Sequence, residues 1–199
     1  DGLRYTGQFV RGRFHGEGKL AAPEGRVYSG WFREGVIDGR GTLTRPDGFT
    51  YTGEFSLGRF NGRGELTYPD GRVYTGEFRN NLVEGEGRLQ YADGSSFTGV
   101  FRDGRPAGKG VRIYPDGSRY QGVYLDGSRQ GQGTLVLPGG TAYEGGFRDD
   151  CYQGHGTIRY PDGREYTGTF SSGRLTGSGR MSWPDGRVYE GEVVDGLME

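Results

Sequence analysis

A short aromatic-x-Gly phrase recurs along the chain at a constant spacing of 23 residues. The aromatic residues that begin the phrases are Tyr5, Tyr28, Tyr51, Tyr74, Phe97, Tyr120, Tyr143, Tyr166 and Tyr189. A glycine stands two residues after each of them, and no insertion breaks the register. A fixed period in this range is typical of repeat arrays, in which each unit is one supersecondary element completed by its neighbours. Function is therefore expected on a long surface.

Each repeat contains two short alternating runs, as residues 74–96 illustrate. In the first run Tyr74, Gly76 and Phe78 fall on one face, as the two-residue period of a β-strand requires. The second run, residues 85–91, alternates in the same way. Helices are disfavoured, because glycine costs up to about 1 kcal/mol per position in a helix. The two runs therefore predict a pair of strands in each unit.

Turn residues separate the runs. Within a unit we expect a five-residue link, as from Gly12 to Gly16, and between units the phrase Pro-Asp-Gly recurs, as at residues 69–71 and 161–163. Proline presets φ and glycine accepts unusual dihedral angles, so both segments predict hairpin turns. The prediction is an all-β, elongated, single-layer antiparallel meander of about 17 or 18 strands. At roughly 4.8 Å per strand it would form a twisted rod about 80 to 85 Å long, with an aromatic groove.

Composition agrees with a thin protein. Hydrophobic residues make up 31% of the chain and aromatic residues 14%. Such a chain must gain its burial from flat rings stacked between units, because it has too few aliphatic side chains for a thick core. The formal net charge is -1, with acidic and basic residues interspersed. This pattern argues against nucleic acid as a partner.

The remaining compositional features concern the compartment. The chain has one cysteine and neither an N-glycosylation sequon nor an apolar signal segment, which favours a cytoplasmic location. No stretch approaches the roughly 20 apolar residues that span a bilayer, so membrane contact would be peripheral. Residues 1–199 form a single array of about nine repeats, and both ends fall within the repeat. We expect a segment of a longer array.

The repeat itself resembles a known family. The phrase Tyr-x-Gly-x-Phe, followed by Gly-x-Gly-x-Leu-x-Tyr-Pro-Asp-Gly, stands almost unaltered at residues 51–71, 74–94 and 166–186. It is similar to the MORN repeat (membrane occupation and recognition nexus), and the array resembles the cytoskeletal MORN scaffolds of protists. This resemblance implies a non-enzymatic scaffold that engages partner proteins, sometimes oligomerises, and often sits at a membrane-cytoskeleton boundary.

Two surfaces are predicted to bind partners. The first is the aromatic groove, lined by Tyr28, Tyr51, Tyr74, Phe97, Tyr120, Tyr143 and Tyr166. The second lies where Arg112 replaces the leucine of the repeat and apolar residues move to the opposite face, at Val100, Val111, Ile113, Val123 and Val136. These residues predict an exposed patch for a partner. The alternative is that valine and isoleucine simply favour strands.

A metal site is a further hypothesis. Cys151 and His155 lie four residues apart in the seventh unit. They are half of a tetrahedral zinc site, and a two-fold dimer would supply Cys2His2. The plainer interpretation is a surface thiol beside an exposed histidine, which the spacing alone favours, so structural zinc at a dimer interface is the minority hypothesis. The predicted dimer end comprises Trp183, Val193, Val194, Leu197 and Met198.

No catalytic constellation is present. The two histidines are far apart in sequence, and neither a Gly-Lys-Ser/Thr loop nor an EF-hand loop occurs. We expect no enzyme and no required cofactor. The leading hypothesis is a scaffold that dimerises through its C-terminal repeats and organises cytoskeletal or membrane-associated partners. The alternative is a phosphoinositide-binding module that uses turn arginines such as Arg72, Arg164 and Arg187, although the balanced charge predicts weak lipid contact.

Overall fold

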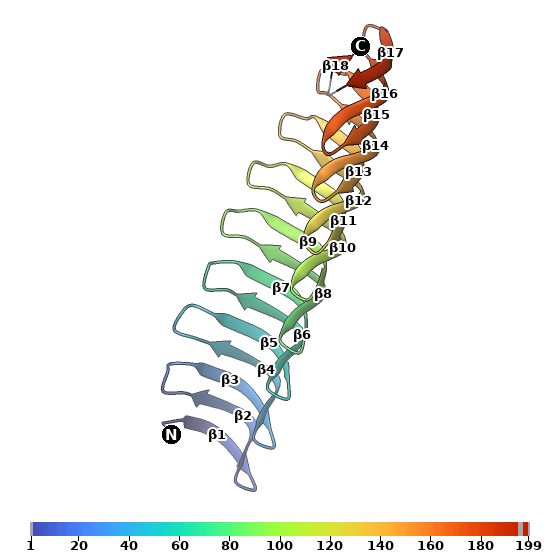
Figure 1. Cartoon of the computed structure of the whole chain (residues 1–199). Helices are drawn as coiled ribbons and strands as arrows, with labels where there is room; N and C mark the ends of the chain where they lie inside the picture. Colours follow the sequence, from blue (N-terminus) through green and yellow to red (C-terminus); the bar gives the residue numbers. More distant parts are fainter. Residues whose placement is uncertain (1, 195–196, 199) are drawn as a thin grey trace. The chain divides into compact units, whose positions relative to one another are not determined.

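The computed structural model describes the backbone of residues 2–194 and 197–198 and the side chains of residues 2–193. In this part of the chain the elements are all β-strands, arranged as consecutive hairpins (Figure 1). The first strand of each repeat has seven residues: β1 (Arg4–Val10), β3 (Val27–Arg33), β5 (Thr50–Ser56), β7 (Val73–Arg79), β9 (Ser96–Arg102), β11 (Arg119–Leu125), β13 (Ala142–Arg148), β15 (Glu165–Ser171) and β17 (Val188–Val194).

The second strand of each complete repeat has nine residues. These strands are β2 (Arg13–Ala21), β4 (Val36–Thr44), β6 (Arg59–Thr67), β8 (Leu82–Gln90), β10 (Arg105–Ile113), β12 (Ser128–Val136), β14 (Cys151–Arg159) and β16 (Arg174–Ser182). The short β18 (Leu197–Met198) follows β17. The strands pair antiparallel in one sheet, which confirms the predicted all-β hairpin meander.

Contacts divide the chain into two compact units. Unit 1 comprises residues 1–94 and 101–104, and unit 2 comprises residues 95–100 and 105–199. Strands β1 to β8 belong to unit 1, and β10 to β18 to unit 2. The same repeat builds both units, so a position in one can be compared with the equivalent position in the other, a multiple of 23 residues away.

The turn inside each hairpin is shorter than the sequence predicts. Only Arg11 and Gly12 form the first turn, and Val10 already faces Arg13 across the two strands. Both turn residues have positive φ, 50° and 75°, as in the two-residue type I′ turn that matches the twist of a hairpin. The register then shifts after Gly7, which is a β-bulge. The expectation of a five-residue link is therefore wrong, because a left-handed residue pair closes the hairpin.

The core of each hairpin is a tyrosine ring lying on a glycine. An added Cβ at Gly64 would come within 2.7 Å of the Tyr51 ring, so only glycine leaves room for it. Tyr51 stacks on Phe60 at 3.8 Å between ring centroids, and Phe78 of the next hairpin meets its edge at 5.0 Å. The Tyr51 hydroxyl donates a hydrogen bond of 2.8 Å to the Glu54 carbonyl oxygen. The ring therefore joins two strands of one hairpin to the following hairpin.

Candidate functional site

The predicted groove rings lie on one face of the sheet, the inner face, but they are core residues. Their exposed fractions range from 0% for Tyr51 and Tyr74 to 2% for Tyr28. Phe97, Tyr120, Tyr143 and Tyr166 are equally buried. Edge contacts such as Tyr74 to Phe101, at 5.0 Å, cover each ring with a phenylalanine of the next hairpin. The expectation that these rings form the open lining of the groove is thereby corrected, since a partner would meet the side chains above them.

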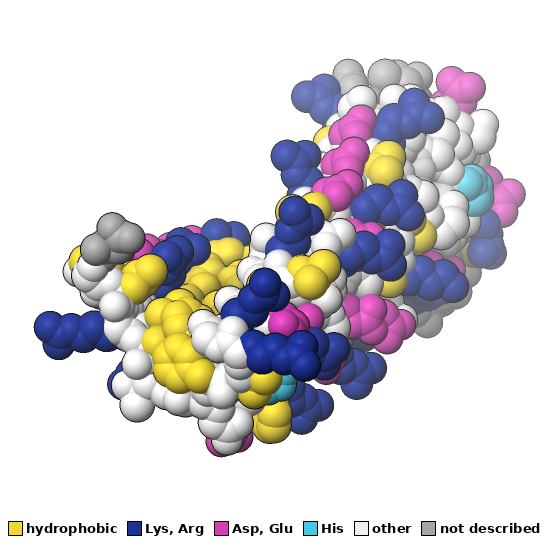
Figure 2. Space-filling model, turned by 90° about the horizontal axis from the view of Figure 1, so that it is seen from below, with side chains coloured by type: hydrophobic (Ala, Val, Ile, Leu, Met, Phe, Trp, Pro, Cys, Tyr) yellow, Lys and Arg dark blue, Asp and Glu magenta, His cyan; other side chains and the backbone are white. Residues whose placement is uncertain are grey.

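The groove of unit 1, named here the inner groove, is formed by two adjoining hollows of about 230 and 570 Å³. Both hollows are bordered by Arg26, Leu43 and Gly58, so they are continuous. Figure 2 shows hydrophobic side chains gathered in a hollow of the N-terminal hairpins, with Lys and Arg side chains at its rim. The apolar lining side chains are Leu3, Leu20, Ala22, Tyr28, Ile37, Leu43, Phe49, Phe55, Phe60, Leu66, Tyr68, Leu82 and Val83.

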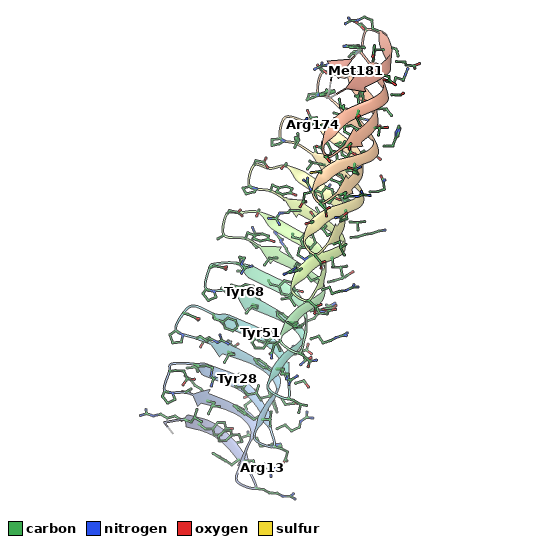
Figure 3. The ribbon with its side chains drawn as sticks, in the orientation of Figure 1. Arg13, Tyr28, Tyr51, Tyr68, Arg174 and Met181 are labelled. Carbon is green, nitrogen blue, oxygen red and sulfur yellow. The ribbon has the colours of Figure 1, made fainter. Side chains whose placement is uncertain are left out.

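The charge of the inner groove is one-sided. Its lining includes Arg26 and Arg45 but neither aspartate nor glutamate. The Arg45 guanidinium lies over the Phe49 ring at 4.2 Å, where its stem adds to the apolar surface. Tyr68 stands at the turn side of the hairpins (Figure 3), and burial raises the pKa of its hydroxyl, which therefore stays neutral. The groove thus combines an apolar floor with a cationic rim.

The turn arginines that could meet a phosphoinositide are already paired. Arg72 Nε donates to Asp70 at 2.8 Å, and Arg164 Nε donates to Asp162 at 2.7 Å. Each guanidinium also lies over the aromatic ring that begins its turn, at 4.6 and 4.9 Å. Backbone and side-chain hydrogen bonds from the arginine lower the pKa of the aspartate. Arg187 repeats the arrangement, so these charges are balanced within their own turns.

The predicted partner patch lies on the other face of the sheet, the outer face. Ile113 and Val136 are 45% and 37% exposed, while Val100, Val111 and Val123 are half-buried. The patch residues therefore share a face, as strand parity predicts. Whether a partner binds there stays a prediction.

The predicted zinc ligands are exposed and lie on one strand, β14. Within the described side chains, no group of three or more His, Cys, Asp and Glu residues could hold a metal ion. Cys151 and His155 alone are an incomplete set, so a shared zinc ion stays a prediction that needs a second copy. At the predicted dimer end, Trp183 is half-buried and Val193 is 1% exposed. The side chains of Val194, Leu197 and Met198 lie outside the described residues.

One buried charge was missed from the sequence. Arg129 occupies the repeat position of Phe60 and Tyr152, and its side chain is only 16% exposed. It lies over the Phe147 ring at 5.2 Å and pairs with Asp150 at 3.0 Å. The break in the repeat at this position was the available signal, because an arginine there must find a carboxylate.

The fold and its surfaces define a β-hairpin repeat protein. The MORN repeat matches residues 5–25, 28–50, 51–71, 74–96, 97–119, 120–142, 143–163, 166–186 and 189–199, and the chain therefore belongs to the MORN-repeat family. No curated protein matches the chain significantly. No helix of the described residues has the length and apolar character to cross a membrane.

Solved structures with a similar fold include the TCP10 domain of Danio rerio CPAP. Its E1021V mutant is 19% identical to the chain, with a TM-score of 0.52, and the match covers 89% of this chain and 84% of that one. The wild-type domain is 20% identical, with a TM-score of 0.51 and coverage of 89% and 85%. These similarities concern the fold alone.

Proposed function

We propose that the chain is a non-enzymatic scaffold that binds segments of partner proteins in the inner groove of unit 1. The observation that carries this proposal is the continuous apolar lining of the groove, bordered by arginines and free of carboxylates. An apolar groove of this kind suits an apolar peptide segment, since burial of one large apolar side chain contributes about 1.5 to 3 kcal/mol. Membership of the MORN family supports the scaffold role.

The repeat gives the binding mechanism. Leu20, Leu43 and Leu66 recur every 23 residues and border the groove, so a partner segment meets a similar contact in successive hairpins. Several weak contacts along one surface give useful affinity when they act together. The cytoskeleton or a peripheral membrane-cytoskeleton boundary is the setting that we propose for such a scaffold, following the family resemblance.

The phosphoinositide alternative finds little support. Lipid headgroups attract clusters of about four to eight unpaired basic residues. Arg72, Arg164 and Arg187 instead donate to the aspartates of their own turns, at 2.7 to 2.8 Å. We therefore propose protein, not lipid, as the main partner, with phospholipid contact weak.

We also propose that the scaffold is a homodimer that associates through its C-terminal repeats. Cys151 and His155 are exposed on β14 and available to a second copy, which would supply the other two ligands of a structural zinc ion. The metal is the minority part of this proposal, and dimerisation through apolar contacts would not require it.

The test of groove binding begins with the full chain and a displayed library of random peptides. A selected peptide is synthesised, and its affinity is measured by fluorescence anisotropy for the native chain and for two variants. Tyr68→Ser removes a groove ring, whereas Trp31→Ser removes a ring that is 50% exposed on the outer face. We expect Tyr68→Ser to weaken binding by about ten-fold, the factor that corresponds to roughly 1.4 kcal/mol, and Trp31→Ser to leave it unchanged.

Circular dichroism checks that both variants remain folded. Loss of binding with Trp31→Ser, or full binding with folded Tyr68→Ser, would place the peptide elsewhere and overturn the groove proposal.

A further inference from the structure

We infer that the outer face of unit 2 carries a second docking surface, for an acidic segment of a partner protein that also bears aliphatic side chains. The surface is a trough of about 570 Å³ over β9 to β12, named here the outer trough. Its lining residues are Thr98, Gly99, Lys109, Gly110, Val111, Arg119, Gln121, Gly122, Val123, Gln132 and Thr134. It lies on the opposite face of the sheet from the core rings and is independent of the inner groove.

The register of the strands builds the trough. Val111 of β10 faces Gln121 of β11, which faces Thr134 of β12. On the other side of the glycines, Lys109 faces Val123. Two valines and the backbone of a glycine row therefore border the same hollow. The aliphatic part of a ligand can contact these valines while its polar groups reach the side chains at the rim.

Outward apolar residues extend the same surface along the strands. Arg119 of β11 lies between Ile113 of β10 and Val136 of β12, and both neighbours are exposed. The methylene stem of an arginine between two aliphatic side chains adds apolar contact and presents the guanidinium to a ligand. Four of the five residues of the predicted partner patch thus adjoin the trough or its edge.

The equivalent hollow of unit 1 shows what is unusual here. It has a volume of about 440 Å³ and is bordered by Trp31, Arg40 and Glu54, with Glu17 and Arg63 also in its lining. Its charges are mixed, and Arg40 lies 4.0 Å from Glu54. Opposite charges that already face each other leave little net potential for a ligand.

The outer trough lacks these carboxylates. Val100 and Val123 stand at the repeat position of Glu54, and Gln132 stands at the position of Glu17. Lys109 keeps a positive charge at the position of Arg63. The substitutions remove each acidic group that borders the unit 1 hollow and replace it with an aliphatic or neutral side chain.

The two cations of the trough are available. Among the ion pairs of the described residues, none includes Lys109 or Arg119, and Arg119 donates only to the neutral Gln121 Oε1, at 2.8 Å. Elsewhere on the outer face, arginines have cross-strand glutamates, as in Arg180 with Glu190 at 3.0 Å. Charge complementarity therefore favours carboxylates as the ligand's charged groups, and the valines favour aliphatic side chains beside them.

The experiment uses the full chain and a synthetic probe peptide in which glutamate and leucine alternate. A control peptide carries lysine in place of each glutamate. The decisive variant is Val123→Glu, which introduces the residue found at the equivalent Glu54 and so suits the fold. The matched control is Glu54→Val, which makes the opposite change in unit 1. Anisotropy titrations at two salt concentrations report the affinity.

We expect the acidic peptide to bind about ten-fold or more tightly than the lysine peptide, with affinity falling as salt rises. Val123→Glu should weaken binding about ten-fold, and Glu54→Val should leave the native affinity unchanged. Binding that withstands Val123→Glu, or binding abolished by the inner-groove variant Tyr68→Ser, would overturn the proposal. The second result would still be consistent with inner-groove binding, so the two proposals fail separately.

Two further measurements separate other occupants. Inorganic phosphate as a competitor should displace the peptide only weakly, because it lacks aliphatic groups, and complete displacement at low millimolar phosphate would overturn the aliphatic part of the proposal. Sedimentation of the chain alone should be unchanged by Val123→Glu. A loss of self-association in that variant would show that a second copy occupies the trough and would also overturn the proposal.

Discussion

Gly64→Ala should destabilise the protein because the glycine lies under a tyrosine ring. An added Cβ would stand 2.7 Å from Tyr51 Cε2 and Oη and 2.8 Å from Cζ. Real Cβ atoms essentially never come this close to other heavy atoms, so the ring has to move. Tyr51 is 0% exposed, stacked at 3.8 Å on Phe60 and met at its edge by Phe78. The ring therefore cannot move without disturbing two hairpins.

The expected cost is that of overpacking a well-filled core, about 1 to 3 kcal/mol. Loss of the 2.8 Å hydrogen bond from the Tyr51 hydroxyl to Glu54 would add roughly 1 kcal/mol if the ring is displaced. The matched control is Gly139→Ala. Gly139 does not have a positive φ, and an added Cβ there meets no atom within 4 Å. That substitution should be neutral or stabilise by about 0.4 to 1 kcal/mol, because it restricts the unfolded chain.

Urea denaturation monitored by circular dichroism measures both variants. A double-mutant cycle adds Tyr51→Ala, which removes the ring and its own contribution of about 3 to 5 kcal/mol. In that background Gly64→Ala should cost almost nothing, and the coupling energy should equal the cost of the clash. The reasoning would be refuted if Gly64→Ala and Gly139→Ala had the same effect, or if the cost of Gly64→Ala were unchanged without the ring.

Three other outcomes follow from the structure. Burial raises the pKa of Tyr28 and Tyr74 to about 12, so stability should be retained below the ordinary tyrosine pKa of 10.0 and fall as the pH rises toward 12, with buried tyrosines ionising only as near-ultraviolet dichroism is lost. Liposome flotation at physiological salt should show weak retention, and tight retention that is lost when Arg164 and Arg187 are neutralised would instead support phosphoinositide binding. Sedimentation should show a homodimer for the intact chain; a chelator and Cys151→Ser should weaken it only if zinc is shared, and a monomer at tens of micromolar would contradict both proposals.

The sequence by itself determined the repeat, the strands and the reason for the glycines. Alternation places Tyr51, Gly53 and Phe55 on one face of a strand, and this depends only on the two-residue period of the backbone. The recurrence of the same phrase after 23 residues then requires each hairpin to pack on another of its kind. The pairing of ring and glycine could also be predicted, since a flat ring over a strand needs a residue without a side chain.

The turn length could not be read in the same way. Glycines at positions 12 and 16 predicted a five-residue link, but the turn uses Arg11 with a φ of 50°. An arginine gives no local signal for a left-handed conformation, which the twist of the paired strands imposes.

Only the tertiary structure decided which residues form surfaces. The exposure of a side chain is set by every atom around it, and most of those atoms belong to neighbouring hairpins. Tyr51 is buried because Phe78, 27 residues later, covers its edge, so the groove surface passes to Leu43 and Tyr68. Likewise, Arg129 is tolerated in the interior because Asp150 of the next hairpin reaches it. Such contacts join repeats that the sequence shows only to be alike, and a position within the repeat does not specify what its neighbour supplies.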